Sequence, residues 1–173
     1  FYSVESNEQA LILRFGKKHA IKSAGLHFKL PFGIDTVKRA QVMEKKKEEF
    51  GFRTTMPGVK TSYQQETPQS KEESRILTGD LNILMVKWVV RYRVSDITNY
   101  FFSLRNPVTT IRDVSESAMR MVVGDSSVDE VLTIGRNRIQ MEVQQQIQEK
   151  LDSYQCGIRI VNVRLKDVTA TDE

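Results

Sequence analysis

The sequence has few of the residues that reactive sites require. Its one cysteine, Cys156, excludes an intramolecular disulfide and a cysteine-rich metal site, and its place at the end of an expected helix favours a small, partly buried residue. The two histidines, His19 and His27, stand outside metal-binding spacings such as His-Glu-x-x-His. We therefore expect no metal site and no cofactor.

Long apolar runs and catalytic motifs are missing as well. No stretch approaches the roughly 20 apolar residues of a membrane-spanning helix. There is no Gly-x-Ser-x-Gly elbow and no glycine-rich phosphate loop, and the acidic residues are scattered. We expect no enzymatic activity. The alternative of another class is a membrane-linked serine hydrolase, which a fluorophosphonate probe would reveal by labelling one serine.

Charge of one sign does not dominate the chain. The sequence has 26 basic and 22 acidic residues, a net charge of +4, and the two signs are interspersed. The densest basic cluster, residues 45–47, lies between acidic neighbours, which is typical of a solvated face. We expect no nucleic-acid binding. A basic module for anionic lipid or nucleic acid stays as an alternative, and its binding would fall as salt rises.

Three short strands are predicted in the first third of the chain. In the first strand, Leu11, Leu13 and Phe15 share one face, and a glycine follows. The second strand covers residues 25–31 and the third covers residues 36–43. Residues 52–74 are polar and contain prolines, which predicts a long mobile loop, and we favour disorder there.

The clearest strand covers residues 84–94, because six apolar side chains occupy alternate positions. A strand with one fully apolar face should lie centrally in an antiparallel sheet, with its other face partly wet. The six residues are Leu84, Val86, Trp88, Val90, Tyr92 and Val94.

After residue 94 the apolar period changes from two to about 3.6, which indicates helices. Asp96, Asn106-Pro107 and Ser127 are the expected helix starts. A longer helix ends near Tyr154, and a closing strand follows. The order predicts an α+β fold, an antiparallel sheet with helices on one side. The expected buried stripes are Ile111, Val114, Ala118, Met121 and Val122 in one helix, and Ile139, Val143, Ile147, Leu151 and Tyr154 in the other.

With the elements assigned, the chain resembles the SPFH, or band 7, domain, and within that family the bacterial HflK-type subgroup. The Phe-Gly-Phe-Arg segment at residues 50–53 and the Leu-Thr-Gly-Asp segment at residues 77–80 favour this subgroup over stomatin or prohibitin. The matching segments span nearly the whole chain: residues 8–17, 25–32, 50–54, 77–82, 90–94, 117–124, 129–133 and 157–163.

The resemblance implies one SPFH domain over residues 1–173, β-rich to about residue 94, helical over 95–156 and closed by a strand over 157–168. It also implies a transmembrane helix before this sequence and a coiled coil after it. Proteins of the HflK type form hetero-oligomeric rings with an HflC-like paralogue on the bacterial inner membrane. There they modulate an FtsH-like membrane protease, with the SPFH domain on the periplasmic side.

A stomatin- or prohibitin-like organiser of membrane microdomains is the alternative within the family. Without an anchor and a coiled coil, the domain should associate with itself only weakly, because ring assembly relies on many repeated contacts.

Two candidate surfaces follow from the scaffold reading. The sequence begins with two aromatic residues, and residues 30–33 form an apolar turn; both could lie among the lipid headgroups of a membrane. Packing of the turn against the core of the domain explains its apolar residues equally well. The candidate membrane-facing residues are Phe1, Tyr2, Leu30 and Phe32. The glutamine-rich side of the last helix offers hydrogen bonds to a neighbouring chain, although a solvated face is the commoner explanation. The candidate assembly face consists of Gln140, Gln144 and Gln148.

Overall fold

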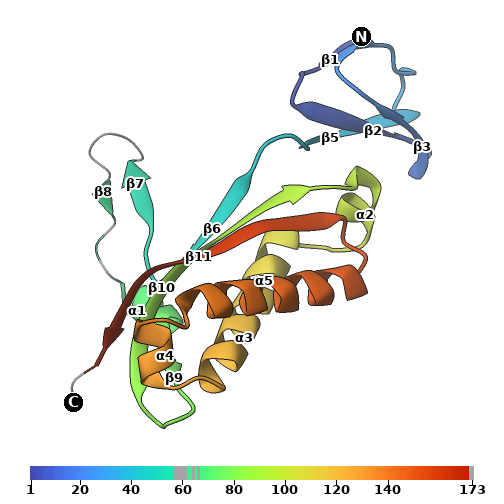
Figure 1. The fold of residues 1–173 in the computed structure, drawn as a ribbon. Coiled ribbons are helices and arrows are strands. Elements are labelled where there is room, and N and C mark those ends of the chain that lie inside the picture. Colours follow the sequence, from blue (N-terminus) through green and yellow to red (C-terminus); the bar gives the residue numbers. More distant parts are fainter. Residues whose placement is uncertain (57–61, 64, 66, 172–173) are drawn as a thin grey trace.

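The computed structural model describes residues 1–56, 62, 63, 65 and 67–171. Two lobes lie end to end: an N-terminal lobe (residues 1–43) built of strands, and a main lobe (residues 46–171) that combines a sheet with helices (Figure 1). The chain begins at the far end of the N-terminal lobe and finishes at the opposite end of the molecule.

The N-terminal lobe is organised around β2, which lies between β3 and β5, while β1 pairs with β4. Both faces of β2 are covered, so alternate residues enter two cores. Ala10 and Ile12 pack with Tyr2 and Val4. A second core consists of Leu11, Leu13, Ala40 and Ile97. The strands are β1 (Tyr2–Val4), β2 (Glu8–Arg14), β3 (Lys17–Lys22), β4 (Gly25–His27) and β5 (Asp35–Gln41).

Two predictions for this lobe need correction. Phe15 does not continue the apolar face of β2. Its φ of 51° and the φ of 78° at Gly16 form the turn into β3, which leaves Phe15 78% exposed. The strand expected over residues 25–31 ends at His27, because the chain bends away to reach the turn before β5.

The sheet of the main lobe is centred on β10 (Ile83–Val94), as the alternation over residues 84–94 predicts. It is antiparallel to all its neighbours, and Trp88 pairs with Phe50 on one side and with Leu165 on the other. Trp88 is fully buried and stacks on the Phe50 ring at 4.5 Å between centroids. The neighbours are β6 (Lys46–Phe50), β9 (Arg75–Leu77) and β11 (Ile158–Ala170).

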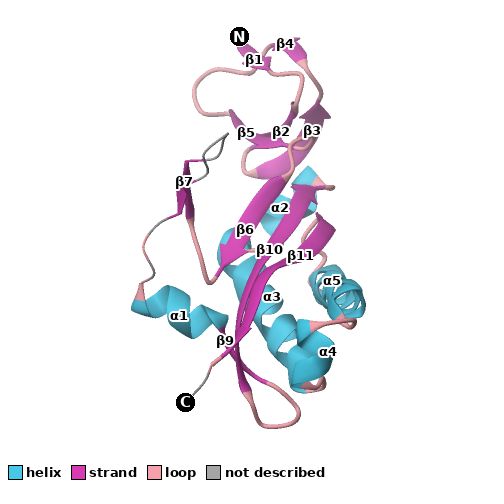
Figure 2. Ribbon diagram, turned by 60° about the vertical axis from the view of Figure 1, so that its left-hand side comes forward, coloured by secondary structure: helices cyan, strands magenta, loops and turns pink. Residues whose placement is uncertain are grey.

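The long helices α3 and α5 cover one face of this sheet (Figure 2), which confirms the predicted α+β architecture. Asp96, Asn106 and Ser127 cap three helices as expected, and Ser127 forms a capping box with Glu130. The helices of the main lobe after β10 are α2 (Ile97–Phe102), α3 (Pro107–Gly124), α4 (Val128–Leu132) and α5 (Arg136–Ser153).

The apolar stripes of α3 and α5 are confirmed except at two residues. Met121 is 49% exposed, because about 3.6 residues per turn put it at the margin of the stripe, beside the groove between the two helices. Tyr154 is 41% exposed, because α5 ends at the preceding residue and the chain turns towards β11.

The region expected to be a mobile loop contains regular structure. Residues 54–56 form β7 (Thr54–Met56), which pairs with β8 (Ser62–Tyr63), and α1 (Pro68–Ser74) follows. Thr67 caps α1 and a proline occupies its first turn, two start signals that were present in the sequence. The part of the disorder prediction at residues 57–61, 64 and 66 lies outside the described residues.

The basic cluster at residues 45–47, which was expected on a solvated face, lies partly within the main sheet. Residues 46 and 47 begin β6, which pairs with β10, and Glu49 further along this strand is only 9% exposed. Each side of the sheet therefore receives one lysine and one glutamate of β6, Lys46 and Glu48 on one side and Lys47 and Glu49 on the other.

Candidate functional site

Exposed apolar side chains gather at the free end of the N-terminal lobe. Phe1 precedes β1, and its ring lies 4.2 Å from that of Phe28, which follows β4. The turn before β5 adds two more residues. We call the set of five the apolar tip: Phe1 (79% exposed), Leu26 (68%), Phe28 (73%), Leu30 (44%) and Phe32 (96%). Large exposed apolar groups gathered in this way indicate a surface that meets a membrane or a partner.

Asp35 holds the turn of the apolar tip in place. Its carboxylate accepts hydrogen bonds from Arg14 Nε at 2.9 Å and from the Leu30 N–H at 3.0 Å. The bond from Arg14, followed by that from Leu30, lowers the pKa of Asp35 to about 2. The Phe15 N–H donates to Ile34 O, so the turn between β2 and β3 lies beside the turn of the tip.

Phe32 has an unusual backbone conformation for an aromatic residue. Its φ is 63°, and its side chain is the most exposed of the large apolar groups. A bulky residue in the left-handed region costs on the order of 1–3 kcal/mol, and such strain is concentrated at functional sites. The strain therefore points to a use for the Phe32 side chain outside the core.

Of the four predicted membrane-facing residues, three are exposed and one is not. Tyr2 is 8% exposed and packs with Val4 in the first core, so it is a core residue, and burial raises its pKa. The prediction was wrong for Tyr2 because Tyr2 and Val4 share the covered face of β1, whereas Phe1 precedes the strand and is exposed. Leu26 and Phe28 were not among the predicted membrane-facing residues, because the alternation over residues 25–31 predicted a longer strand there.

The three glutamines of the candidate assembly face are bonded within the chain. Gln140 Oε1 accepts from the Leu165 N–H at 2.8 Å, and Gln148 Oε1 accepts from the Ile160 N–H at 2.8 Å. Gln144 Nε2 donates to Val161 O at 3.4 Å. One turn of helix separates each glutamine from the next, so the row follows the outer edge of β11. A contact between these residues and a neighbouring chain stays a prediction.

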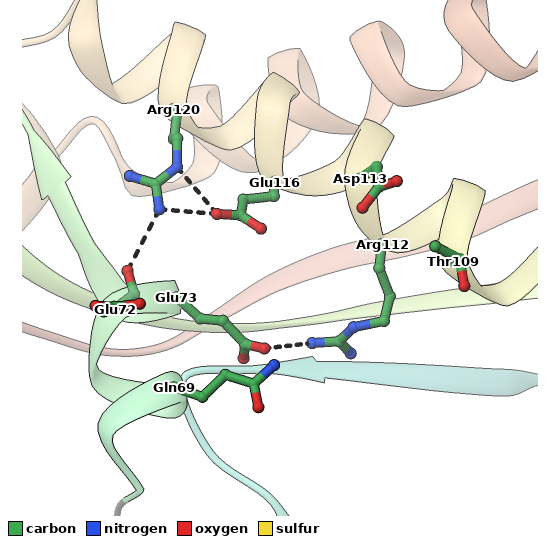
Figure 3. Close-up of a pocket in the computed structure, with 8 residues that line it drawn as sticks. All are labelled: Gln69, Glu72, Glu73, Thr109, Arg112, Asp113, Glu116 and Arg120. Atoms are coloured by element: carbon green, nitrogen blue, oxygen red, sulfur yellow. Dashed lines mark hydrogen bonds and ion pairs between the residues drawn. The ribbon is translucent and has the colours of Figure 1, made fainter.

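A charged cleft of about 390 Å³ lies between α1 and α3 (Figure 3). Arg112 crosses its inner end, where it donates to Glu48 Oε2 and Glu73 Oε1, each at 3.0 Å, and covers the Phe50 ring. Arg120 bonds Glu116 at 2.8 Å. We call this feature the α1–α3 cleft; its lining is Gln69, Glu72, Glu73, Thr109, Arg112, Asp113, Glu116 and Arg120.

Glu73 joins three elements inside this cleft. Burial alone would raise its pKa, but hydrogen bonds from Arg53 and from the Gly51 N–H, with the nearby charge of Arg112, lower it overall. The carboxylate therefore stays charged and fastens α1 to the end of β6 and to α3. These contacts describe a structural junction, with acidic groups left at its outer rim.

The residues considered for chemistry have structural surroundings. His27 makes a 2.8 Å hydrogen bond to Ser23 O, and Cys156 is fully buried, which raises the pKa of its thiol. Among the described residues, no three His, Cys, Asp or Glu side chains are placed to hold a metal ion. Over the same residues, every helix is too short or too polar to cross a bilayer.

Comparison with known proteins agrees with this architecture. The model of the family described as SPFH domain / Band 7 family matches residues 2–173. The chain belongs to the SPFH, or band 7, family. The resemblance noted in the sequence is thereby confirmed over almost the full chain.

Curated relatives of this SPFH domain carry the name HflK. "Protein HflK" of Treponema pallidum is 32% identical over 172 residues, covering 98% of the chain and 51% of that protein. "Protein HflK" of Borreliella burgdorferi is 31% identical, with 96% and 51% covered. "Modulator of FtsH protease HflK" of Escherichia coli is 30% identical, with 100% and 36% covered. The chain thus spans between about a third and half of the relatives it matches.

Proposed function

We propose that this SPFH domain is the assembly domain of a non-catalytic, membrane-anchored scaffold that modulates an FtsH-like membrane protease. Its partners in this proposal are an HflC-like paralogue, the protease and the lipid bilayer. The protein is anchored in the bacterial inner membrane by one transmembrane helix, with the SPFH domain on the periplasmic side. The names of the HflK relatives support the protease, and family membership supports the scaffold.

The apolar tip is the observation that carries the membrane part of the proposal. Phe1 and Phe28 lie 4.2 Å apart, and three more exposed apolar residues stand in β4 and in the segment that joins it to β5. Aromatic residues are enriched at the headgroup level of a bilayer, where their rings contact both lipid and water. Phe32 has a strained backbone, and its turn is held in place by Asp35. Both features fit insertion of the Phe32 side chain into a membrane.

Flotation with uncharged phosphatidylcholine vesicles tests the tip. The double variant F28D/F32D should abolish co-flotation of the chain, because two charges then replace the apolar contact. Aspartate tolerates the positive φ at position 32 better than phenylalanine does, so the fold should survive. The matched control is F102D/I134D, which changes two exposed apolar residues of the main lobe and should float like the wild type. Equal flotation of both variants would contradict the membrane role.

Cross-linking in the native membrane tests the protease part. The longer protein to which this sequence belongs, cross-linked in inner membranes and analysed by mass spectrometry, should yield an HflC-like paralogue and an FtsH-like protease. Recovery of other membrane proteins without a protease would favour the stomatin-like organiser instead.

A further inference from the structure

The net positive charge of the chain belongs entirely to the N-terminal lobe, which forms one end of the molecule (Figure 1). Residues 1–43 contain seven of the 26 basic residues and three of the 22 acidic ones, a net charge of +4. Residues 44–173 contain 19 of each sign and are neutral overall. The lobe that carries the apolar tip is therefore also the positively charged part of the molecule.

The carboxylates of this lobe put little negative charge on its surface. Asp35 is buried, and Arg14 lies 2.9 Å from its carboxylate. Glu8 is half-buried, and its Oε2 atom is enclosed by the protein. Of the three acidic residues, only Glu5 is exposed, so the basic side chains decide the potential at the surface of the lobe.

Four exposed lysines supply most of this positive charge. Within the part of the chain that the structure describes, their side chains make no hydrogen bond and no ion pair. The arginines of the lobe have partners inside it, because Arg14 bonds Asp35 and Arg39 lies over the Tyr2 ring. We call the four residues the tip lysines: Lys17, Lys18, Lys22 and Lys29.

Two of the tip lysines border the part of the apolar tip that β4 carries. Lys29 follows Phe28 directly in the chain. Lys22 ends β3, and the turn behind it is held to β4, because His27 makes a 2.8 Å hydrogen bond to Ser23 O. One lysine therefore stands before β4 and one after it, next to the exposed apolar side chains of that strand.

The other two tip lysines border the turn that carries Phe32. The Phe15 N–H donates to Ile34 O at 3.0 Å, which brings the start of β3 beside this turn. Lys17 and Lys18 are the first residues of β3, and both are exposed. Apolar and cationic side chains thus alternate along both parts of the tip.

We propose that the N-terminal lobe binds a bilayer surface that carries acidic phospholipids, with the apolar tip in the interface and the tip lysines on the lipid headgroups. The inference rests on the proposed scaffold function and identifies the class of lipid that its membrane contact prefers. The long stem of a lysine lies along apolar surface while its ammonium group stays among polar groups. An apolar contact and a group of positive charges together hold a protein on a membrane more firmly than one of them alone.

Binding to vesicles of two compositions tests this preference. The chain is floated with pure phosphatidylcholine and with phosphatidylcholine of which about a third is replaced by phosphatidylglycerol. The wild type should partition at least about tenfold more strongly into the anionic vesicles, because each lysine near an anionic surface contributes roughly fivefold. This gain should disappear as salt rises from about 0.1 M to about 1 M, because the Debye length shrinks from about 10 Å to about 3 Å. Equal partitioning into both compositions would overturn the proposal.

Removal of the lysines locates the contact. K22Q/K29Q should lose partitioning into the anionic vesicles by about tenfold or more and should keep the wild-type value on uncharged vesicles. R105Q/K166Q, which removes the same charge from two exposed positions of the main lobe, is the control and should behave like the wild type. Equal losses in the two variants would mean that the net charge of the whole chain attracts it to the vesicles, which contradicts a contact at the tip.

Three of these lysines lie on β3, an edge strand, where lysine can serve only to prevent pairing with another strand. Under that explanation K17Q/K18Q and K22Q/K29Q would aggregate but keep the wild-type preference for anionic vesicles, and the proposal would fail. A wild-type chain that floats with neither kind of vesicle would contradict the membrane role itself. A chain that floats equally with both would contradict the lipid preference alone.

Discussion

Asp35 receives hydrogen bonds from Arg14 and from the Leu30 N–H, so one carboxylate connects the end of β2 to the turn that carries Leu30 and Phe32. The pKa of Asp35 in the folded chain is about 2, while that of an unfolded aspartate is about 3.9. The stabilisation is therefore fully present above about pH 4 and is lost as the pH falls towards 2.

The variant D35N should flatten this dependence. We expect the melting temperature of the wild type to exceed that of D35N at pH 5, and the difference to shrink as the pH falls to 2, measured by thermal unfolding followed by circular dichroism. D113N is the control, because the exposed Asp113 carboxylate makes no ion pair among the described residues. A gap between wild type and D35N that is the same at both pH values would show that the carboxylate charge has no role.

At the scale of elements, α5 does more than bury an apolar stripe. β11 is an edge strand of the main sheet, and edge strands present unpaired N–H and C=O groups. Gln140, Gln144 and Gln148 bond these groups along the edge. Glutamines that looked like a surface for a neighbouring chain thus cover an edge that would otherwise be open to pairing with another strand.

Replacing one of these glutamines should loosen the edge. Gln148 bonds both Ile158 O and the Ile160 N–H, so Q148A should lower the free energy of unfolding by about 1–2 kcal/mol. It should also speed hydrogen exchange at the Ile160 amide. Q145A is the matched control, because Gln145 lies on the same helix and bonds only the exposed Glu149; its effect should stay within about 0.5 kcal/mol. Equal effects in chemical denaturation would refute the edge-covering role.

At the scale of the whole molecule, the second core joins the two lobes. Ile97 begins α2 in the main lobe but is buried among Leu11, Leu13 and Ala40 of the N-terminal lobe. Lys38 of β5 also lies over the Phe101 ring, 5.3 Å from its centroid. The apolar tip is therefore held at a defined orientation to the main sheet.

Removing the Ile97 side chain should weaken this junction. I97A should cost about 2–5 kcal/mol, because a fully buried isoleucine leaves a cavity. The N-terminal lobe should then unfold before the main lobe, visible as two transitions in calorimetry in place of one. F102A, which truncates a half-exposed residue of the same helix, should change stability by less than about 0.5 kcal/mol and keep one transition. A single transition in I97A would indicate that the lobes are coupled by other contacts.

The alternation over residues 84–94, the helix caps and the apolar stripes by themselves determined the central strand, the helices that follow it and the fold class. These features depend on local periodicity and on hydrogen bonds between near neighbours in the chain, which a sequence displays directly. Family membership followed for the same reason, because its matching segments are short runs of consecutive residues.

Only the tertiary structure decided which surfaces are available. Tyr2 and Phe1 are adjacent in sequence, yet one is buried and the other exposed, because Ala10 and Ile12 of β2 pack on one side of β1. Arg93 and Arg159 lie opposite each other only because β10 and β11 pair in antiparallel register. Contacts between residues far apart in the chain leave no local pattern, and exposure and charge complementarity depend on those contacts.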